Sequence, residues 1–241
     1  MKYRLEEIAA LIAAATQEEQ KELAALLDYD LSDLGDAAKK KDVVGYTLAK
    51  HLWWEYQTPL GWLVKKPSFD DICVDIAKRL KLQGLTGPKT DCWHLLSSIV
   101  RNLTEKMLDE MDADQKKEFV KKFLTDDEYK RFMKHKKIDY AKVGSGTLFI
   151  AMTKFGGLAT YSFAIIAANQ VSRILLGKGL SWAANAVLVR TVPLLMGPVG
   201  WLLFLWGFND LMGTNYKRVI PASFYIYSIY ERLKAKKSLP F

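Results

Sequence analysis

The sequence predicts an all-α protein, in which a helical bundle surrounds a glycine-containing apolar helical hairpin. Apolar residues recur at spacings of three and four along most of the chain, as they do on one face of a helix. No segment of useful length shows the two-residue alternation of a half-buried strand. Residues 144–213 form a strongly apolar tract that is too long for one ordinary core helix, so we expect it to fold as a hairpin.

Residues 1–36 are predicted to form a small acidic helical hairpin. Apolar residues within 5–12 share one helical face. Thr16 and Glu19 then form a capping box that begins a second helix, which ends near Leu27. The Asp-rich loop Asp28–Asp36 is expected to close the hairpin. With three basic and nine acidic residues, this segment has a net charge of about −6, whereas the whole chain has +8. We therefore consider residues 1–36 a candidate contact for a protein partner.

Residues 37–241 are predicted to form one helical bundle domain that contains the apolar tract. Its first three helices are expected at Val43–Tyr56, Phe69–Gln83 and Cys92–Met111. Proline, glycine or capping residues mark their boundaries. Pro59 follows the first of these helices. Gly84–Pro88 ends the second, and Thr90 or Asp91 caps the third.

The later helices are delimited in the same way. We expect them at Gln115–Leu124, from a capping box at Thr125 to about Lys137, and at Thr147–Leu176, Leu180–Val192, Leu194–Met212 and Tyr216–Lys236. Gly156 and Gly157 softly interrupt the first helix of the apolar tract, and Pro193 and Pro198 kink the last part. Pro221 is an alternative start for the final helix.

The densest part of the apolar tract is residues 191–208, about 18 residues without a charge, near the lower length limit for crossing a bilayer. Three interpretations remain open: a permanently buried core, conditional insertion into a membrane, and constitutive anchoring. Lys154 and Arg190 count against simple membrane spans, because a charge at the bilayer centre costs at least about 2.5 kcal/mol.

Basic stretches at Lys116–Lys142 and Lys217–Lys237 flank the tract and favour anionic lipid head groups. The candidates for lipid docking are Lys134, Lys136, Lys137, Lys217, Arg218, Arg232, Lys234, Lys236 and Lys237. The candidates for membrane insertion are Phe149, Ile150, Phe163, Ile165, Leu194, Leu195, Trp201, Leu202, Leu203, Phe204, Leu205 and Trp206. Solvated helix faces are the more ordinary interpretation of the basic stretches. Nucleic acid is not expected as a partner, since no recognition motif is present.

The sequence offers no catalytic, metal or cofactor site. Two cysteines, Cys73 and Cys92, are too few for a four-ligand zinc site or a disulfide framework. Cys92 and His94 are two residues apart on a predicted helix, so they point to different faces and cannot pair as nucleophile and base. Asp70 and Asp71 are expected to stabilise the start of their helix. We expect no enzyme and no cofactor.

No secretory signal is apparent at the start of the chain, so we expect synthesis in the cytoplasm, with membrane association as an open alternative. The oligomeric state is left open.

Four short stretches resemble the YaaW-like family, a bacterial group of uncharacterised proteins sometimes placed near the ubiquinol–cytochrome c chaperones. They are Asp71–Leu82, Lys106–Phe119, Gly197–Gly200 and Tyr216–Pro221, and the likeness extends over residues 65–232. The first 35 residues are similar to a short helical module found ahead of that domain. The resemblance implies a bacterial helical protein and carries over no activity and no site residues.

These observations lead to two functional hypotheses. The leading one is a non-enzymatic membrane-active protein, a soluble bundle that docks on anionic lipid, inserts its apolar hairpin and forms a pore or permeabilises the membrane. The alternative is a soluble protein-binding or chaperone-like interaction module, which keeps the hairpin as a permanent core and engages its partner through residues 1–36.

Overall fold

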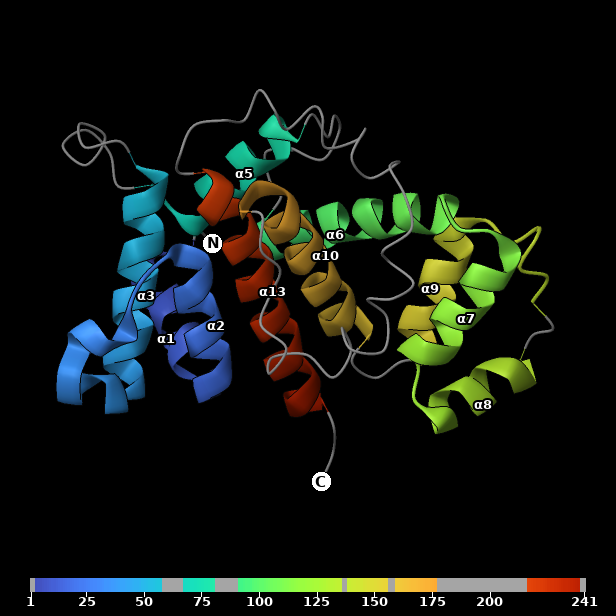
Figure 1. Cartoon of the computed structure of the whole chain (residues 1–241), viewed down its shortest axis with the longest axis horizontal. Helices are drawn as coiled ribbons and strands as arrows, with labels where there is room; N and C mark the ends of the chain where they lie inside the picture. The colour runs from blue at the N-terminus through green and yellow to red at the C-terminus, as the bar shows by residue number, and fades with distance from the viewer. Residues whose placement is uncertain are drawn as a thin grey trace.

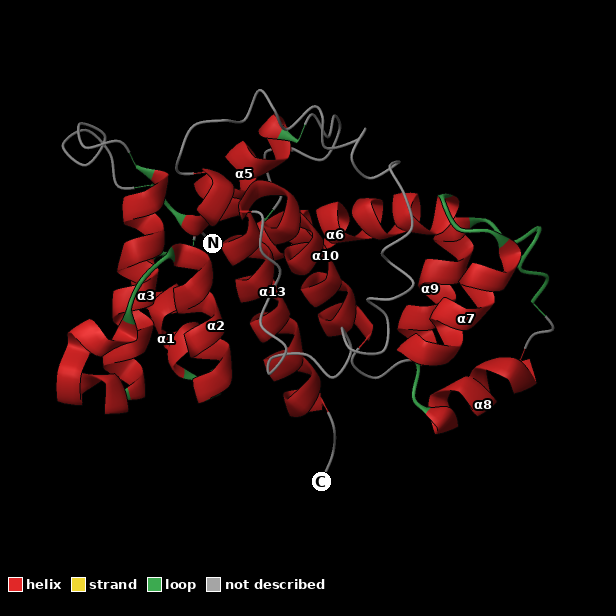
Figure 2. Cartoon of the chain, in the orientation of Figure 1, coloured by secondary structure: helices red, strands yellow, loops and turns green. Residues whose placement is uncertain are grey.

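The computed structural model describes residues 3–57, 67–80, 91–135, 138–155, 159–176 and 216–238. All regular structure in these ranges is helical, which confirms the predicted all-α class (Figure 2). The apolar tract is described from Gly144 to Leu176, except for residues 156–158. The expected helices Leu180–Val192 and Leu194–Met212 lie outside the described residues.

The N-terminal part of the chain forms one group of short helices on one side of the molecule (Figure 1). These are α1 (Leu5–Ala13), α2 (Gln17–Leu27), the 3₁₀ segment η1 (Leu31–Lys39) and α3 (Lys41–Tyr56). The predicted capping box is confirmed, because the Glu19 amide donates to Thr16 Oγ1 at 3.2 Å and the Thr16 amide donates to Glu19 Oε2 at 2.8 Å. The expected loop after α2 is largely replaced by η1, which begins where the Ser32 amide donates to Asp30 Oδ1 at 2.9 Å.

Helices α1 and α3 cross closely at Gly45. A Cβ atom at this position would lie 2.5 Å from the carbonyl oxygen of Ala9 and 2.8 Å from the amide nitrogen of Ala13. Glycine is therefore required for this backbone approach. The crossing joins α1 to a helix beyond residue 36, and the predicted domain boundary there stays a prediction.

The middle of the chain supplies a second group of helices, which α6 connects to the centre of the molecule (Figure 1). They are α7 (Ala113–Phe123), α8 (Asp126–His135) and α9 (Ser145–Phe155). α5 (Phe69–Arg79) packs against α6 (Cys92–Asp109) at the central end of α6. Asp91 caps α6, since the His94 amide donates to its Oδ1 at 2.8 Å. The predicted capping box at Thr125 is confirmed by the 3.0 Å bond from its amide to Glu128 Oε2.

Two helices that are distant in sequence form the centre of the bundle. α10 (Ala159–Leu176) and α13 (Tyr216–Ser238) pack side by side and bury Phe163 and Phe224 completely (Figure 1). Pro221 lies inside α13, which begins at Tyr216, so the alternative start is wrong. Within the described part of the chain, no helix combines the length and apolarity that a bilayer span requires.

Candidate binding site

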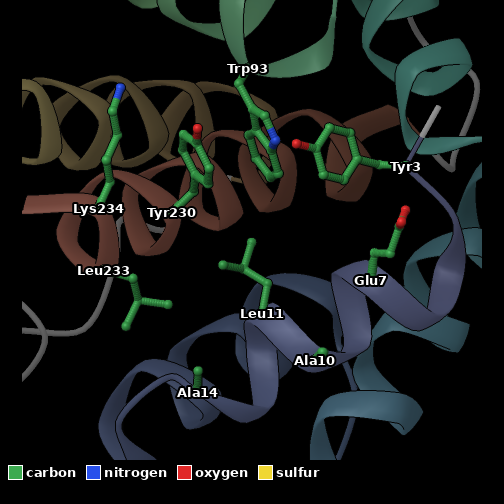
Figure 3. Close-up of a pocket in the computed structure, with 9 residues that line it drawn as sticks. All are labelled: Tyr3, Glu7, Ala10, Leu11, Ala14, Trp93, Tyr230, Leu233 and Lys234. Carbon is green, nitrogen blue, oxygen red and sulfur yellow. The ribbon is translucent and has the colours of Figure 1, made fainter. Parts of the chain in front are cut away.

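A cleft of about 640 Å³ lies between α1 and α13, and the first turn of α6 closes a third side of it (Figure 3). α1 contributes Glu7, Ala10, Leu11 and Ala14, and α13 contributes Tyr230, Leu233 and Lys234. Tyr3 and Trp93 complete the lining. Most of this surface is therefore hydrocarbon or aromatic ring, with one carboxylate and one ammonium group.

The cleft exists because α1 has two different faces. Ile8 and Ile12 are fully buried and pack into the core. Ala10 and Ala14 lie on the other face and remain exposed. Their methyl groups are too short to reach α13, whereas larger side chains at the same spacing would fill the space between the two helices. The sequence thus leaves a gap in the packing where most helix pairs would interdigitate.

Three aromatic rings form one wall of the cleft. The rings of Trp93 and Tyr230 stack in parallel planes with their centroids 4.1 Å apart. Tyr3 meets Trp93 edge-on, with centroids 5.3 Å apart and planes at 71°. Such edge and stacked arrangements suit the ring quadrupoles and hold the rings in place. Trp93 Nε1 is buried and has no hydrogen-bond partner among the described residues, and in Figure 3 it faces Tyr3.

The carboxylate of Asp70 holds two of these rings together. Its Oδ2 accepts the Tyr3 amide at 2.6 Å, and its Oδ1 accepts the Cys92 amide at 3.0 Å. A single buried side chain on α5 thus fixes the backbone next to both Tyr3 and Trp93. Asp70 lies in the first turn of α5, as expected, and its carboxylate has this tertiary role in addition. Asp71 performs the capping, since its Oδ2 accepts the Ser68 amide at 2.8 Å.

The two charged groups of the lining differ in their surroundings. Glu7 Oε2 accepts the Arg4 amide at 2.7 Å, and its carboxylate points toward Tyr3 in Figure 3. Lys234 Nζ is 3.8 Å from Glu231 Oε1 and 5.8 Å from the centroid of the Tyr230 ring. In the same view its ammonium group points away from the cleft. Burial raises the pKa of Tyr230, so the phenol stays neutral at physiological pH.

Two ion-pair networks fix α13 relative to the N-terminal helices. Arg232 Nε and Nη2 each donate to a different oxygen of Glu19 at 2.6 Å, and both side chains are buried. Arg218 Nη1 donates to Glu55 Oε1 at 2.7 Å, and its Nη2 also reaches Asp28. Bidentate guanidinium–carboxylate pairs impose a defined geometry. The width of the cleft is therefore set by contacts outside it.

The candidates for membrane insertion that the structure describes are buried, except for one exposed residue. Phe163 and Ile165 on α10 are fully buried, and the ring of Phe149 on α9 lies tilted by 35° against Phe163, with centroids 4.8 Å apart. Ile150 on α9 is 54% exposed. The remaining candidates lie outside the described residues: Leu194, Leu195, Trp201, Leu202, Leu203, Phe204, Leu205 and Trp206. Use of the buried residues at a membrane would require α10 to leave α13.

The candidates for lipid docking also differ in their exposure to solvent. Lys134, Lys234 and Lys236 are exposed, and Lys217 is half-buried. The guanidinium groups of Arg218 and Arg232 are bound to carboxylates inside the fold. The side chains of Lys136, Lys137 and Lys237 lie outside the description. Among the lipid-docking candidates whose side chains are described, those open to solvent are therefore all lysines.

The residues considered for catalysis or metal binding lie in different surroundings. Cys92 is buried and His94 is exposed, as their spacing predicted. Cys92 contacts Cys73. Burial is the main cause that raises the pKa of the Cys73 thiol, and the contact with Cys92 raises it further. Across the described ranges, no three His, Cys, Asp or Glu side chains are grouped to hold a metal ion.

Sequence reasoning missed the cleft. One local signal was available, since Glu7, Ala10, Leu11 and Ala14 follow helical spacing on the face opposite the buried isoleucines. The stacking of Trp93 on Tyr230 joins residues far apart in the chain, so no local pattern could predict it.

Two bacterial relatives match the chain, both described as UPF0174 proteins of Helicobacter pylori (strain J99). One is 30% identical over 174 residues, covering 70% of this chain and 62% of that protein. The other is 33% identical over 90 residues, covering 36% of this chain and 43% of that protein. The chain thus spans less than two thirds of the length of either relative. No family model and no solved structure matches it. The similarity supports an uncharacterised bacterial family, and the YaaW-like name is not confirmed.

Proposed function

We propose that this protein is a non-enzymatic binding protein that holds a small, largely apolar ligand in the cleft between α1 and α13. The observation that carries the proposal is the cleft itself, about 640 Å³ of space lined by aromatic and aliphatic side chains with few polar groups. Ligand sites in proteins generally have this size and this composition.

The walls of the cleft are set before any ligand arrives. Asp70 fixes the backbone beside Tyr3 and Trp93, and the Glu19–Arg232 pair fixes α13. A preformed site binds with less loss of conformational entropy than one that must be ordered by its ligand. The geometry therefore favours binding by a rigid pocket.

Binding of a neutral apolar dye such as Nile red tests this function. We expect saturable fluorescence enhancement with one dye per chain. Ala10→Phe and Ala14→Phe extend aromatic rings into the cleft and should weaken binding roughly tenfold, about 1.4 kcal/mol. Ala25→Phe is the matched control, because Ala25 is an exposed residue of α2 that does not line the cleft. The proposal would be contradicted if the dye did not bind saturably, or if the Ala10→Phe and Ala14→Phe variants bound it as tightly as the unmodified protein.

Membrane insertion is the second candidate function, and the observation in its favour is the uncharged run 191–208 between basic stretches. Leakage of a dye from anionic liposomes but not from neutral ones would support it. Intact liposomes at every pH tested would count against it. A protein partner at residues 1–36 also stays a proposal, supported by the acidic charge of that segment.

A further inference from the structure

We infer that the ligand of the cleft is an organic cation, an ammonium group on an apolar body, held beside Glu7 and the aromatic rings of Tyr3 and Trp93. The inference rests on the proposed function and adds the chemical class of the ligand. It follows from the charge of the lining, the arrangement of the rings and the apolar remainder of the cleft.

The aromatic wall of the cleft favours a cationic ligand. The π-faces of tyrosine and tryptophan are electrostatically negative, and ammonium ions bind to them, best where water is excluded. Three rings, those of Tyr3, Trp93 and Tyr230, lie in one row along the cleft (Figure 3). At the outer end of the row, Lys234 already has its ammonium group 5.8 Å from the Tyr230 centroid. One face of Trp93 is covered by Tyr230, so a second cation approaches this wall at its other end, beside Tyr3.

The distribution of charge is the second argument. At the Tyr3 end of the cleft Glu7 supplies a carboxylate, whereas Lys234 lies at the other end with its ammonium group turned outward (Figure 3). Arg4 is exposed at the start of α1. A cation in the cleft meets an opposite charge, whereas an anion there would meet a like one.

The apolar body of the ligand is the third argument. Beyond Glu7 the lining continues as Leu11, Leu233 and the methyl groups of Ala10 and Ala14. An alkyl chain removed from water against these side chains contributes about 0.8 kcal/mol per buried CH₂ group. The site thus combines a position for a cation with a slot for a hydrocarbon chain, as an alkylammonium compound requires.

Isothermal titration calorimetry with three probes that carry eight-carbon chains tests the inference. The dissociation constants of octyltrimethylammonium, 1-octanol and octanoate are compared, each below its micelle-forming concentration. We expect octyltrimethylammonium to bind at least tenfold more tightly than the alcohol, and octanoate to bind most weakly. Glu7→Gln should reduce the ratio of cation affinity to alcohol affinity from at least tenfold to about one. Glutamine preserves the capping box of α1, so the fold is retained.

Glu6→Gln is the matched control, because Glu6 is the exposed neighbour of Glu7 on the same helix and does not line the cleft. Its cation preference should equal that of the unmodified protein. Tyr3→Leu should reduce binding of the cation more than binding of the alcohol. If the alcohol binds as tightly as the cation, or octanoate binds best, the inference is overturned and the proposed function stands. If no probe binds, the proposed function fails and the inference fails with it.

Discussion

Arg232 of α13 binds Glu19 of α2 through two hydrogen bonds of 2.6 Å, although 213 residues separate them in the chain. Both side chains are buried, with 10% and 6% of their surfaces exposed. Glu19 also completes the capping box at the start of α2 through Thr16. The pair therefore links the first helices of the chain to the last helix, and it fixes the helix that forms one side of the cleft.

Removal of the guanidinium group should be strongly destabilising. Arg232→Met leaves the Glu19 carboxylate buried without its partner, and we expect the free energy of unfolding to fall by about 3–5 kcal/mol in urea denaturation. In the double variant Arg232→Met, Glu19→Gln, most of this loss should be recovered, because no buried charge remains and glutamine keeps the capping box. Equal stability of the single and double variants would contradict a charge-based role.

Gly45→Ala tests the close crossing of α1 and α3. The added methyl group would meet the Ala9 carbonyl oxygen at 2.5 Å, so the two helices must move apart. We expect a loss of about 1–3 kcal/mol in the free energy of unfolding, despite the better helix propensity of alanine. Gly144→Ala is the control, since nothing lies within 4 Å of a Cβ atom there. A Gly45→Ala variant as stable as this control would rule out the tight contact.

Glu231 makes stability depend on pH. Burial raises the pKa of its carboxyl group, although Lys234 and Tyr227 act in the opposite direction. A carboxyl group with a raised pKa in the folded state favours folding when protonated, and this advantage is lost as the pH rises through that pKa. Glu231→Gln mimics the protonated form, so its melting temperature should exceed that of the unmodified protein at pH 8. The difference should disappear below the ordinary glutamate pKa of 4.5. A pH-independent difference would contradict the assignment.

The two thiols should react only after unfolding. Cys73 and Cys92 are buried, with exposures of 0% and 1%, and burial raises the pKa of Cys73. Because the thiolate is the nucleophile, both features slow alkylation. Mass spectrometry after iodoacetamide treatment should find no modified cysteine in buffer and two in guanidinium chloride. Rapid alkylation in buffer would show that α5 and α6 open readily.

Local patterns were sufficient to place most of the helices in the described ranges. Thr16 and Thr125 mark helix starts through hydrogen bonds that involve only residues three positions apart, so the sequence shows them directly. The segment η1 was expected as a loop, because aspartates and a glycine favour turns in isolation. The interruption predicted at Gly156 and Gly157 lies outside the described residues and stays a prediction.

The binding site could not be predicted in the same way. Asp70 lies in the first turn of its helix, as expected, but no local pattern shows that its carboxylate also accepts amides from Tyr3 and Cys92, which are 67 and 22 residues away. Arg232 was one candidate for lipid docking, and the structure places its guanidinium group against Glu19. Such long-range pairings depend on how helices are arranged in space, which periodicity along one helix does not determine.

The most direct test of the account is an NMR titration of ¹⁵N-labelled protein with octyltrimethylammonium. The indole N–H signal of Trp93, assigned through Trp93→Phe, is the central observable, because this ring forms the middle of the aromatic wall. We predict that the largest shifts occur at this indole and at the amides of Glu7, Leu11 and Leu233, and that they saturate together. Shifts that centre on other helices, or no saturable shift at Trp93, would show that the cleft between α1 and α13 is not the binding site.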